Sequence, residues 1–331
     1  MTATIATRTK QVVVVNDALT DPRVNLDTVR EFDARSFILG PLFALDEVVG
    51  VVLFIYHERF HTFSINEVDF VRRLSLSLGL AVANARMYQS EHDIAETLQT
   101  ALLALPQRIP GLEFAHLYHS ATEAARVGGD FYDLFELEHG RVGITIGDIS
   151  GHGVEAAVLT SLVKNTIRVQ AADNKAPDVA MASASKILFD ESAPEIFATV
   201  FFGVFNCKDG VLEYCNAGHT TGACISPHGN VRPLPANSPL VGAFPAEEFH
   251  LSTERLGDGD ILFLYTDGLT EARGDTERFG EDRLFDLLAQ ERDGEPGKTM
   301  SRVVDKVLAF ANGRLTDDLA VLAVQRVVAH D

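Results

Sequence analysis

Apolar runs separated by polar, turn-forming residues occupy residues 11–63, a pattern typical of β-strands and turns. Residues 36–56 form one long apolar run with a turn expected at 45–47, which predicts a hairpin. From Ser64 onward apolar residues recur at steps of three and four, as on one face of a helix. Ser64 and Glu67 have the spacing of a capping box. The N-terminal part is therefore predicted to be strands followed by a helix.

A second helical face covers residues 94–105, after the polar break QSEHD at 89–93. The prolines in PQRIPG end it, because proline cannot continue a helix. Two interpretations of residues 64–105 remain open. They form either a pair of helices packed on their own domains or a helix that mediates a homodimer.

Beyond Gly111 the strand pattern returns, with hairpin turns expected at 139–140 and 208–210. Hairpins combined with blocks of helix predict the α+β class rather than a doubly wound sheet. We expect helices at 153–170, 178–191, 281–290 and 299–312.

Length and net charge limit the classes of protein to which the chain can belong. The 331 residues suggest two domains of ordinary size. The net charge of −19, from 47 acidic and 28 basic residues, argues against nucleic acid or an anionic membrane as a partner. Three cysteines suggest a reducing compartment, and no apolar run is long enough for a signal peptide or a membrane span. We therefore expect a cytoplasmic protein.

Aspartates next to glycines stand at the ends of several predicted strands. Each alone is most simply a turn residue, because Asp-Gly is a common turn signal. Together, converging carboxylates would repel one another unless divalent cations compensated them. Oxygen-only ligands favour Mg²⁺ or Mn²⁺, and two such ions about 4 Å apart can activate a water for displacement at phosphorus. No cysteine is followed by Arg six positions later, so a cysteine-phosphatase loop is absent.

The motifs GGDFYD, GDISGHG, NAGH, YTDGLTEA and TDDLAVL occur in this order. In this the chain resembles the metal-dependent protein phosphatases (PPM, protein phosphatase 2C-like) of the bacterial SpoIIE/RsbU branch, over about residues 90–327. The resemblance implies a sandwich of two antiparallel β-sheets flanked by helices, with a dinuclear Mn²⁺ or Mg²⁺ site. It also implies hydrolysis of phosphoserine or phosphothreonine in a protein, often a small phosphorylated anti-sigma-factor antagonist.

The same resemblance implies the ligands of the two ions. The role of Asp133 remains open, either as a ligand or as a strand-capping partner. Gly151 and Gly153 are expected to shape the turn after Asp148. The implied ligands are Asp130, Asp148, the backbone carbonyl of Ile149, Asp267 and Asp317, with Asp318 as the alternative to Asp317.

Residues 11–88 resemble part of a GAF domain, without a counterpart of that family's opening helix and first strands. The expected organisation is therefore a partial GAF-like sensory module at 11–88, a helical linker at 89–110 and the phosphatase domain at 111–328. The module is expected to regulate the phosphatase.

Several other interpretations remain. A catalytically silent relative that only binds a phosphoprotein is the main alternative, although such a relative would be expected to lose ligands.

HERFH at 57–61 matches the zinc-peptidase pattern, but it follows a strand and lacks the required helix. GEPGKT at 294–299 lacks the leading glycine of a phosphate-binding loop. His152 and His219 are either general acids or, as we favour, residues that hold loop geometry.

Overall fold

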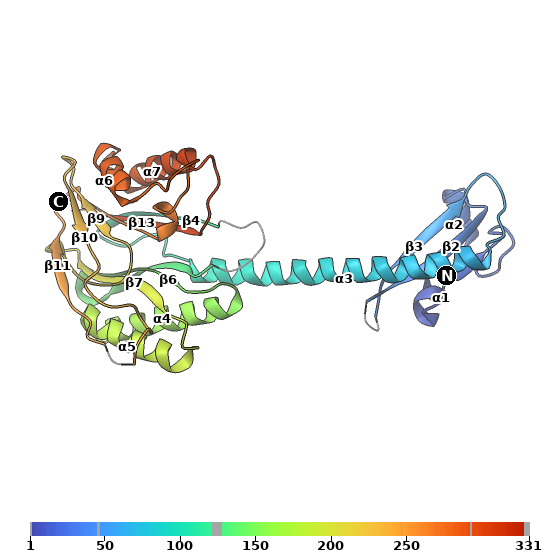
Figure 1. The fold of residues 1–331 in the computed structure, drawn as a ribbon, viewed down its shortest axis with the longest axis horizontal. Helices are drawn as coiled ribbons and strands as arrows, with labels where there is room; N and C mark the ends of the chain where they lie inside the picture. Colours follow the sequence, from blue (N-terminus) through green and yellow to red (C-terminus); the bar gives the residue numbers. More distant parts are fainter. Residues whose placement is uncertain (1, 45–46, 121–127, 246, 292, 328–331) are drawn as a thin grey trace. The chain divides into compact units, whose positions relative to one another are not determined.

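A computed structural model describes residues 2–44, 47–120, 128–245, 247–291 and 293–327 (Figure 1). The chain divides into two compact units, Met1–Glu91 and His92–Asp331.

The first unit contains a three-stranded antiparallel sheet in the order β1-β2-β3. Its turn at 45–47 lies partly outside the described residues. The two short helices that accompany the sheet were not predicted from the sequence. The elements are α1 (Thr2–Thr9), β1 (Val13–Val15), α2 (Leu26–Glu31), β2 (Ser36–Ala44) and β3 (Glu47–Tyr56).

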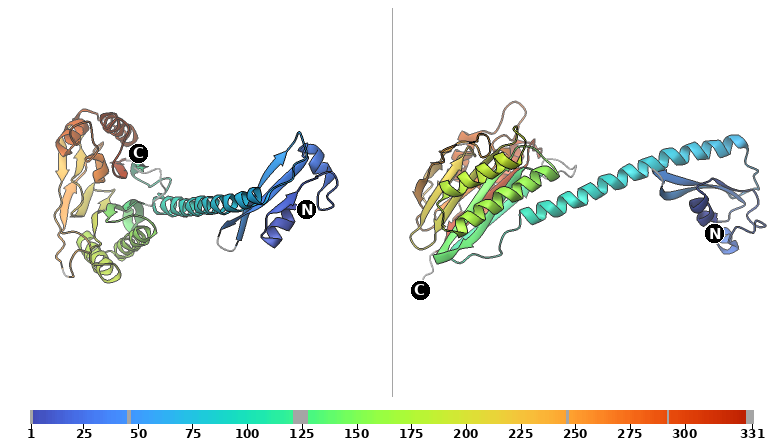
Figure 2. Two further views of the ribbon diagram at one scale, coloured as in Figure 1. Left: turned by 45° about the vertical axis from the view of Figure 1, so that its right-hand side comes forward. Right: turned by 90° about the horizontal axis from the view of Figure 1, so that it is seen from below.

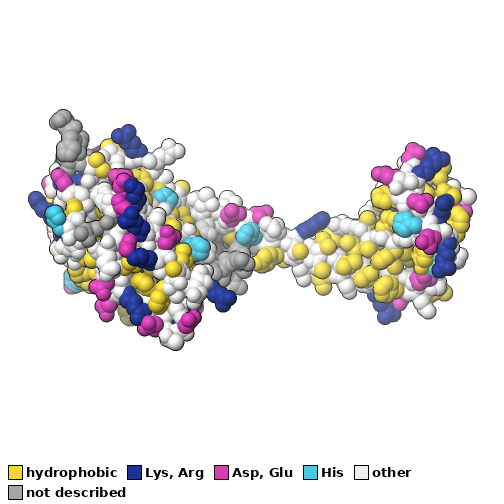
Figure 3. All heavy atoms as spheres, turned by 90° about the horizontal axis from the view of Figure 1, so that it is seen from above, with side chains coloured by type: hydrophobic (Ala, Val, Ile, Leu, Met, Phe, Trp, Pro, Cys, Tyr) yellow, Lys and Arg dark blue, Asp and Glu magenta, His cyan; other side chains and the backbone are white. Residues whose placement is uncertain are grey.

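Helix α3 (Ile65–Leu102) follows, and its first residues are fixed by the predicted capping box. The Ser64 amide donates to Glu67 Oε2 at 2.7 Å, and the Glu67 amide donates to Ser64 Oγ at 3.4 Å. The helix runs without interruption through 89–93, so the predicted break there was wrong. Exposed hydrophobic side chains gather along α3, among them Leu76, Leu80 and Met87 (Figure 3).

The second unit is a sandwich of two five-stranded antiparallel sheets, as predicted. We call them the β12 sheet and the β6 sheet. The β12 sheet has the order β10 (Val231–Leu234), β9 (Gly222–Ile225), β12 (Ile261–Tyr265), β13 (Leu319–Arg326) and β4 (Leu112–His119). The β6 sheet has the order β11 (Ser252–Arg255), β8 (Val211–Ala217), β7 (Ala198–Asn206), β6 (Arg141–Ile149) and β5 (Asp130–Leu137).

Helices cover the outer face of each sheet. Figure 2 shows α4 (Val154–Ala172) and α5 (Pro177–Glu191) running side by side over the β6 sheet. Helices α6 (Glu281–Gln290) and α7 (Pro296–Phe310) lie over the β12 sheet (Figure 1). All four predicted helices and both predicted hairpin turns are therefore confirmed. The turns are a short 3-10 helix η1 (Glu138–Gly140) and residues 207–210.

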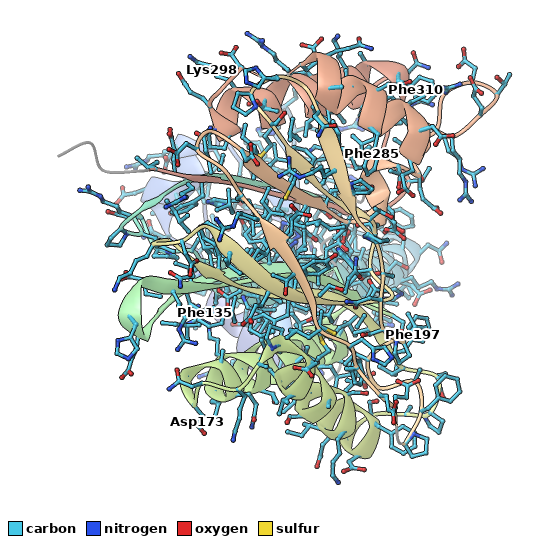
Figure 4. All side chains as sticks on the ribbon, turned by 90° about the vertical axis from the view of Figure 1, so that its left-hand side faces the viewer. Phe135, Asp173, Phe197, Phe285, Lys298 and Phe310 are labelled. Carbon is cyan, nitrogen blue, oxygen red and sulfur yellow. The ribbon has the colours of Figure 1, made fainter. Side chains whose placement is uncertain are left out.

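The alternation of side chains along each strand separates the cores. On β5, Tyr132 and Leu134 face the core between the sheets, whereas Phe131 and Phe135 pack under α4 and α5. Figure 4 shows Phe135 on the α4 and α5 side, and Phe285 and Phe310 on the α6 and α7 side. Because successive side chains on a strand point to opposite faces, alternate residues enter the core between the sheets, and the residues between them enter the core under the helices.

No described helix combines the length and the apolar composition needed to cross a bilayer.

Candidate metal centre

The hairpin of β5 and β6 places two of the predicted ligands opposite each other. Asp130 and Asp148 are direct partners in the antiparallel register. Asp130 stands two residues before Tyr132, and Asp148 stands two residues after Ile146. Each therefore points to the same face of its strand as these core residues, toward the opposite sheet. They lie where the apolar core between the sheets ends.

The β12 sheet brings its acidic residues to the same end. Asp267 opens the short helix η2 (Asp267–Leu269) just after β12, and Asp317 and Asp318 precede β13. Because β12 and β13 are antiparallel neighbours, the end of one lies beside the start of the other. The Thr266 amide donates to the Ala320 carbonyl at 3.0 Å and closes this junction.

The carboxylates of the two sheets raise one another's pKa. Burial, and then the charges of Asp267, Asp317 and Asp318, raise the pKa of Asp148 to about 7. Burial, and then the charge of Asp148, raise the pKa of Asp130 well above its ordinary value. In the part of the chain that the structure describes, no Lys or Arg forms an ion pair with Asp130, Asp148, Asp267 or Asp317. Buried negative charge without a basic partner is costly, and bound cations would remove that cost.

Three glycines leave the space that the carboxylates and carbonyls occupy. A Cβ on Gly129 would lie 2.0 Å from the Ile149 carbonyl oxygen and 2.4 Å from Asp148 Oδ1. A Cβ on Gly128 would lie 1.7 Å from Asp318 Oδ2, and one on Gly268 would lie 2.0 Å from the Asp318 carbonyl oxygen. The Ile149 carbonyl, a predicted ligand, therefore lies next to Asp148 Oδ1 on the side of Gly129.

These oxygens fit hard cations in type and in burial. Among the described residues, no three His, Cys, Asp or Glu side chains already form a group that could hold a metal ion. Carboxylates that repel one another would need a cation to draw them together. The donor set is all oxygen, which suits Mg²⁺ or Mn²⁺.

Asp317 and Asp318 differ in their surroundings. Asp318 Oδ2 accepts a hydrogen bond from the Tyr118 hydroxyl at 2.9 Å, and Oδ1 accepts one from Ser120 Oγ at 3.1 Å. The Asp317 carboxylate accepts the Asp318 amide at 2.8 Å. Asp318 is thus held by side chains of the β4 segment. The charges of both aspartates act on Asp148, and that of Asp317 also acts on Asp267.

Glu271 is an acidic neighbour that the sequence analysis did not single out, although it lies inside the motif YTDGLTEA. Its charge raises the pKa of both Asp267 and Asp317, after the larger effect of burial. It forms an ion pair with Arg278 at 2.5 Å.

Asp133 is neither a ligand nor a strand cap. It stands three residues after Asp130, so its side chain points to the opposite face of β5, toward α4. There it is buried and accepts hydrogen bonds from Arg168 Nε at 2.5 Å and Nη2 at 2.7 Å. This ion pair fixes α4 to β5.

The loop after Asp148 has the predicted backbone. Gly151 and Gly153 have φ of 112° and 88°, which disfavours any residue with a side chain. Gly153 is the N-cap of α4. The amide of Ser150 donates to the carbonyl of Phe197 at 2.9 Å. Phe197, labelled in Figure 4, therefore marks the end of the sandwich at which this loop lies.

The two histidines of the motifs differ in exposure. His152 is exposed in the glycine turn. His219 is buried, its Nδ1 lies 2.9 Å from Thr199 Oγ1, and its amide donates to Asn216 Oδ1 at 2.9 Å. These contacts fit the loop-holding role favoured for His219.

His219 predicts an acid-sensitive stability. Burial lowers its pKa from 6.5 to about 4, so the unfolded chain binds a proton at this residue between these values and the folded chain does not. Stability should therefore fall as pH falls from 6.5 to 4, by about 3 kcal/mol from this group. We expect urea unfolding to show a shallower decline over this range in His219→Gln. An unchanged decline would contradict the prediction.

The zinc-peptidase interpretation is wrong. Residues 57–61 are not helical, and His61 Nε2 lies 2.8 Å from Glu67 Oε1 while its ring stacks on Tyr56.

Comparison with known proteins identifies the family. The family model described as Stage II sporulation protein E (SpoIIE) matches residues 138–327, more than half of the chain. The chain belongs to the SpoIIE family. A GAF domain model matches residues 3–83, so the SpoIIE-type domain is preceded by a GAF domain.

Two curated relatives show how far the similarity extends. Protein IcfG of Synechocystis sp. is 29% identical over 67% of this chain and 39% of its own length. Phosphoserine phosphatase RsbU of Bacillus subtilis is 22% identical over 80% of both chains. This chain therefore spans well under half of IcfG and most of RsbU.

Solved structures share the fold. The RsbU and RsbW domains of Rv1364c from Mycobacterium tuberculosis align with a TM-score of 0.58 and 26% identity, over 68% of this chain and 62% of that one. RsbX, solved in complex with magnesium, aligns with a TM-score of 0.51 and 14% identity, over 67% and 98%. The SpoIIE-type domain thus has the fold of the protein phosphatase 2C structures.

Proposed function

We propose that this protein is a metal-dependent serine/threonine protein phosphatase. The observation that carries the proposal is the group of aspartates from both sheets at the end of the sandwich. There Asp130 is buried and Asp148 is half-buried, and among the described residues neither forms an ion pair with a Lys or Arg. The relative RsbU bears the name phosphoserine phosphatase, which agrees with hydrolysis at this site.

Two Mn²⁺ or Mg²⁺ ions would be held by Asp130, Asp148, the Ile149 carbonyl, Asp267 and Asp317. When bound, such ions lower the pKa of a water and stabilise charge on the phosphoryl oxygens. Asp130 and Asp148 supply a ligand pair from one hairpin, and Asp267 and Asp317 supply a second pair from the other sheet. Asp318, held by Tyr118 and Ser120, supports the second pair rather than replacing Asp317.

The chain's own residues do the remaining work. The Gly129 backbone leaves the Ile149 carbonyl free to face the centre. Burial of Asp130, and partial burial of Asp148, limits the access of bulk water to these carboxylates, which strengthens their attraction to cations. If the ions supplied an activated water as the nucleophile, no side chain would need to form a covalent intermediate.

The substrate is proposed to be a phosphorylated protein, in particular a small anti-sigma-factor antagonist. In Rv1364c an RsbU domain and an RsbW domain occur in one structure, which suits a partner-switching pathway. We further propose that residues 11–88 sense a signal, that 89–110 link them to the catalytic part, and that 111–328 carry the phosphatase.

The test is hydrolysis of p-nitrophenyl phosphate and of a phosphoserine protein, with and without Mn²⁺. Mn²⁺-dependent release would support the phosphatase. Absence of release with any divalent metal, from the whole chain and from residues 106–331, would favour the catalytically silent phosphoprotein-binding alternative.

We also propose a homodimer formed through α3. Leu76, Leu80 and Met87 follow one another at steps of four and seven, so they share one helix face, and each is more than half exposed. A second copy of this helix would cover them in a coiled-coil contact.

Met87→Glu should convert the dimer to a monomer in multi-angle light scattering, because a charge would enter the apolar contact. Ala85→Glu, an exposed position on the opposite face, is the matched control and should leave the dimer intact. A monomeric wild-type chain at concentrations well above those of the assays would refute the dimer.

A further inference from the structure

One threonine hydroxyl connects the two sheets at the carboxylates. Thr266 follows β12 directly and is fully buried. Its Oγ1 donates a hydrogen bond of 2.6 Å to Asp130 Oδ2, on β5 of the opposite sheet. The same Oγ1 accepts the Ala320 amide at 2.8 Å. Thr266 therefore holds a residue of each sheet at once.

The direction of these bonds is determined by chemistry. The Ala320 amide can only donate, so Thr266 Oγ1 accepts there. Its single proton has two acceptors in reach, Asp130 Oδ2 at 2.6 Å and the Ala320 carbonyl at 3.5 Å, and the much shorter distance assigns it to Asp130. A carboxylate has two oxygens. The bond from Thr266 takes up one lone pair of Oδ2 and fixes the direction in which the carboxylate points, while Oδ1 and the other lone pair of Oδ2 stay available to a cation.

Thr266 also joins the ligands through its own backbone. It is the residue before Asp267, and its amide donates to the Ala320 carbonyl at 3.0 Å. A shift of Thr266 would thus move Asp267 along the chain and Asp130 through the hydrogen bond. The two ligand pairs, one from each sheet, are coupled at this residue.

We propose that Thr266 is a positioning residue of the metal centre, which fixes the orientation of Asp130 as a ligand and the spacing of the two sheets there. The inference rests on the proposed function, because it requires that these carboxylates bind cations. It adds to that function a residue that contacts a ligand without contacting the metal.

The test is titration of the full chain with Mn²⁺ in an isothermal calorimeter, which measures binding without turnover. Thr266→Val keeps the shape of the side chain and removes the hydroxyl. We expect its Mn²⁺ affinity to fall about 10-fold or more, the range found for partners of metal ligands. Thr266→Ser keeps the hydroxyl and should bind Mn²⁺ nearly as tightly as the wild type.

Thr145→Val is the matched control. Thr145 is also a buried threonine of the sandwich, but its hydroxyl has no hydrogen-bond partner among the described residues. This variant should bind Mn²⁺ with wild-type affinity. Circular dichroism establishes that each variant is folded, and Thr266→Ala replaces Thr266→Val if that variant is not.

Wild-type affinity in the variant without the hydroxyl would overturn the proposal, and so would a loss in Thr266→Ser as large as in Thr266→Val. If the wild-type chain itself binds no Mn²⁺, the metal centre of the proposed function fails together with this inference. If the wild type binds and the hydroxyl has no effect, only the role of Thr266 is refuted.

Discussion

Asp148→Asn and Asp267→Asn should each abolish Mn²⁺-dependent hydrolysis while leaving the fold intact. Asparagine keeps the side-chain shape but lacks the negative charge that attracts a cation. Loss of a direct ligand should reduce turnover by more than about 100-fold, beyond the range typical of outer-shell partners. The two residues come from different sheets, so parallel losses would indicate that both sheets contribute to one centre.

Folding of these variants should be unharmed in the absence of metal. Burial and neighbouring carboxylates raise the pKa of Asp148 and of Asp267, so removing either charge relieves repulsion. We expect melting temperatures equal to or above that of the wild type when EDTA is present. Asp173→Asn is the control, because Asp173 is an exposed aspartate at the end of α4, far from Phe197 in Figure 4. Full activity in both Asp148→Asn and Asp267→Asn would show that the assigned site is wrong.

Arg168→Met should strongly destabilise the SpoIIE-type domain. Asp133 is only 1% exposed, and Arg168 is its hydrogen-bonded counter-ion. Removing one partner of such a pair leaves a buried charge, which costs about 3–5 kcal/mol. We expect the lower end of that range, because the charge of Lys164 also acts on Asp133. Urea unfolding in EDTA measures the loss.

The control is a pair of the same charge types in an exposed position. Lys186 and Asp190 are 73% and 54% exposed, so Lys186→Ala should cost less than about 0.5 kcal/mol. The double variant Asp133→Leu/Arg168→Met should be more stable than Arg168→Met, since no charge is then buried alone. Equal stability of Arg168→Met and Lys186→Ala would contradict the structural role of the pair.

The strands and helices of the sandwich could be predicted because their signals are local. The hairpin turns at 138–140 and 207–210 include residues with positive φ, among them His139, Gly140 and Gly210, between alternating strands. The break predicted at 89–93 failed for a physical reason. Polar residues are compatible with an α-helix, and no glycine or proline occurs between Gly79 and Pro106 to end one.

The candidate site was only partly visible in the sequence. Its aspartates stand in motifs, but their partners depend on strand pairing. Tyr118 is 200 positions away from Asp318, and Thr266 is 136 positions away from Asp130. The orientation of Asp133 could have been predicted from the sequence. Asp133 is an odd number of residues from Asp130 on one strand, so the two carboxylates must lie on opposite faces.

The β5–β6 hairpin has a practical consequence. Its turn at 138–140 and the pair of Asp130 and Asp148 stand at opposite ends of the same ladder, roughly 23 Å apart at the usual rise per residue. A peptide tag inserted after the exposed His139 would lengthen the turn and leave the register of the strands unchanged. This turn is therefore a suitable attachment point for tethering the protein to a surface with its carboxylate end facing the solution.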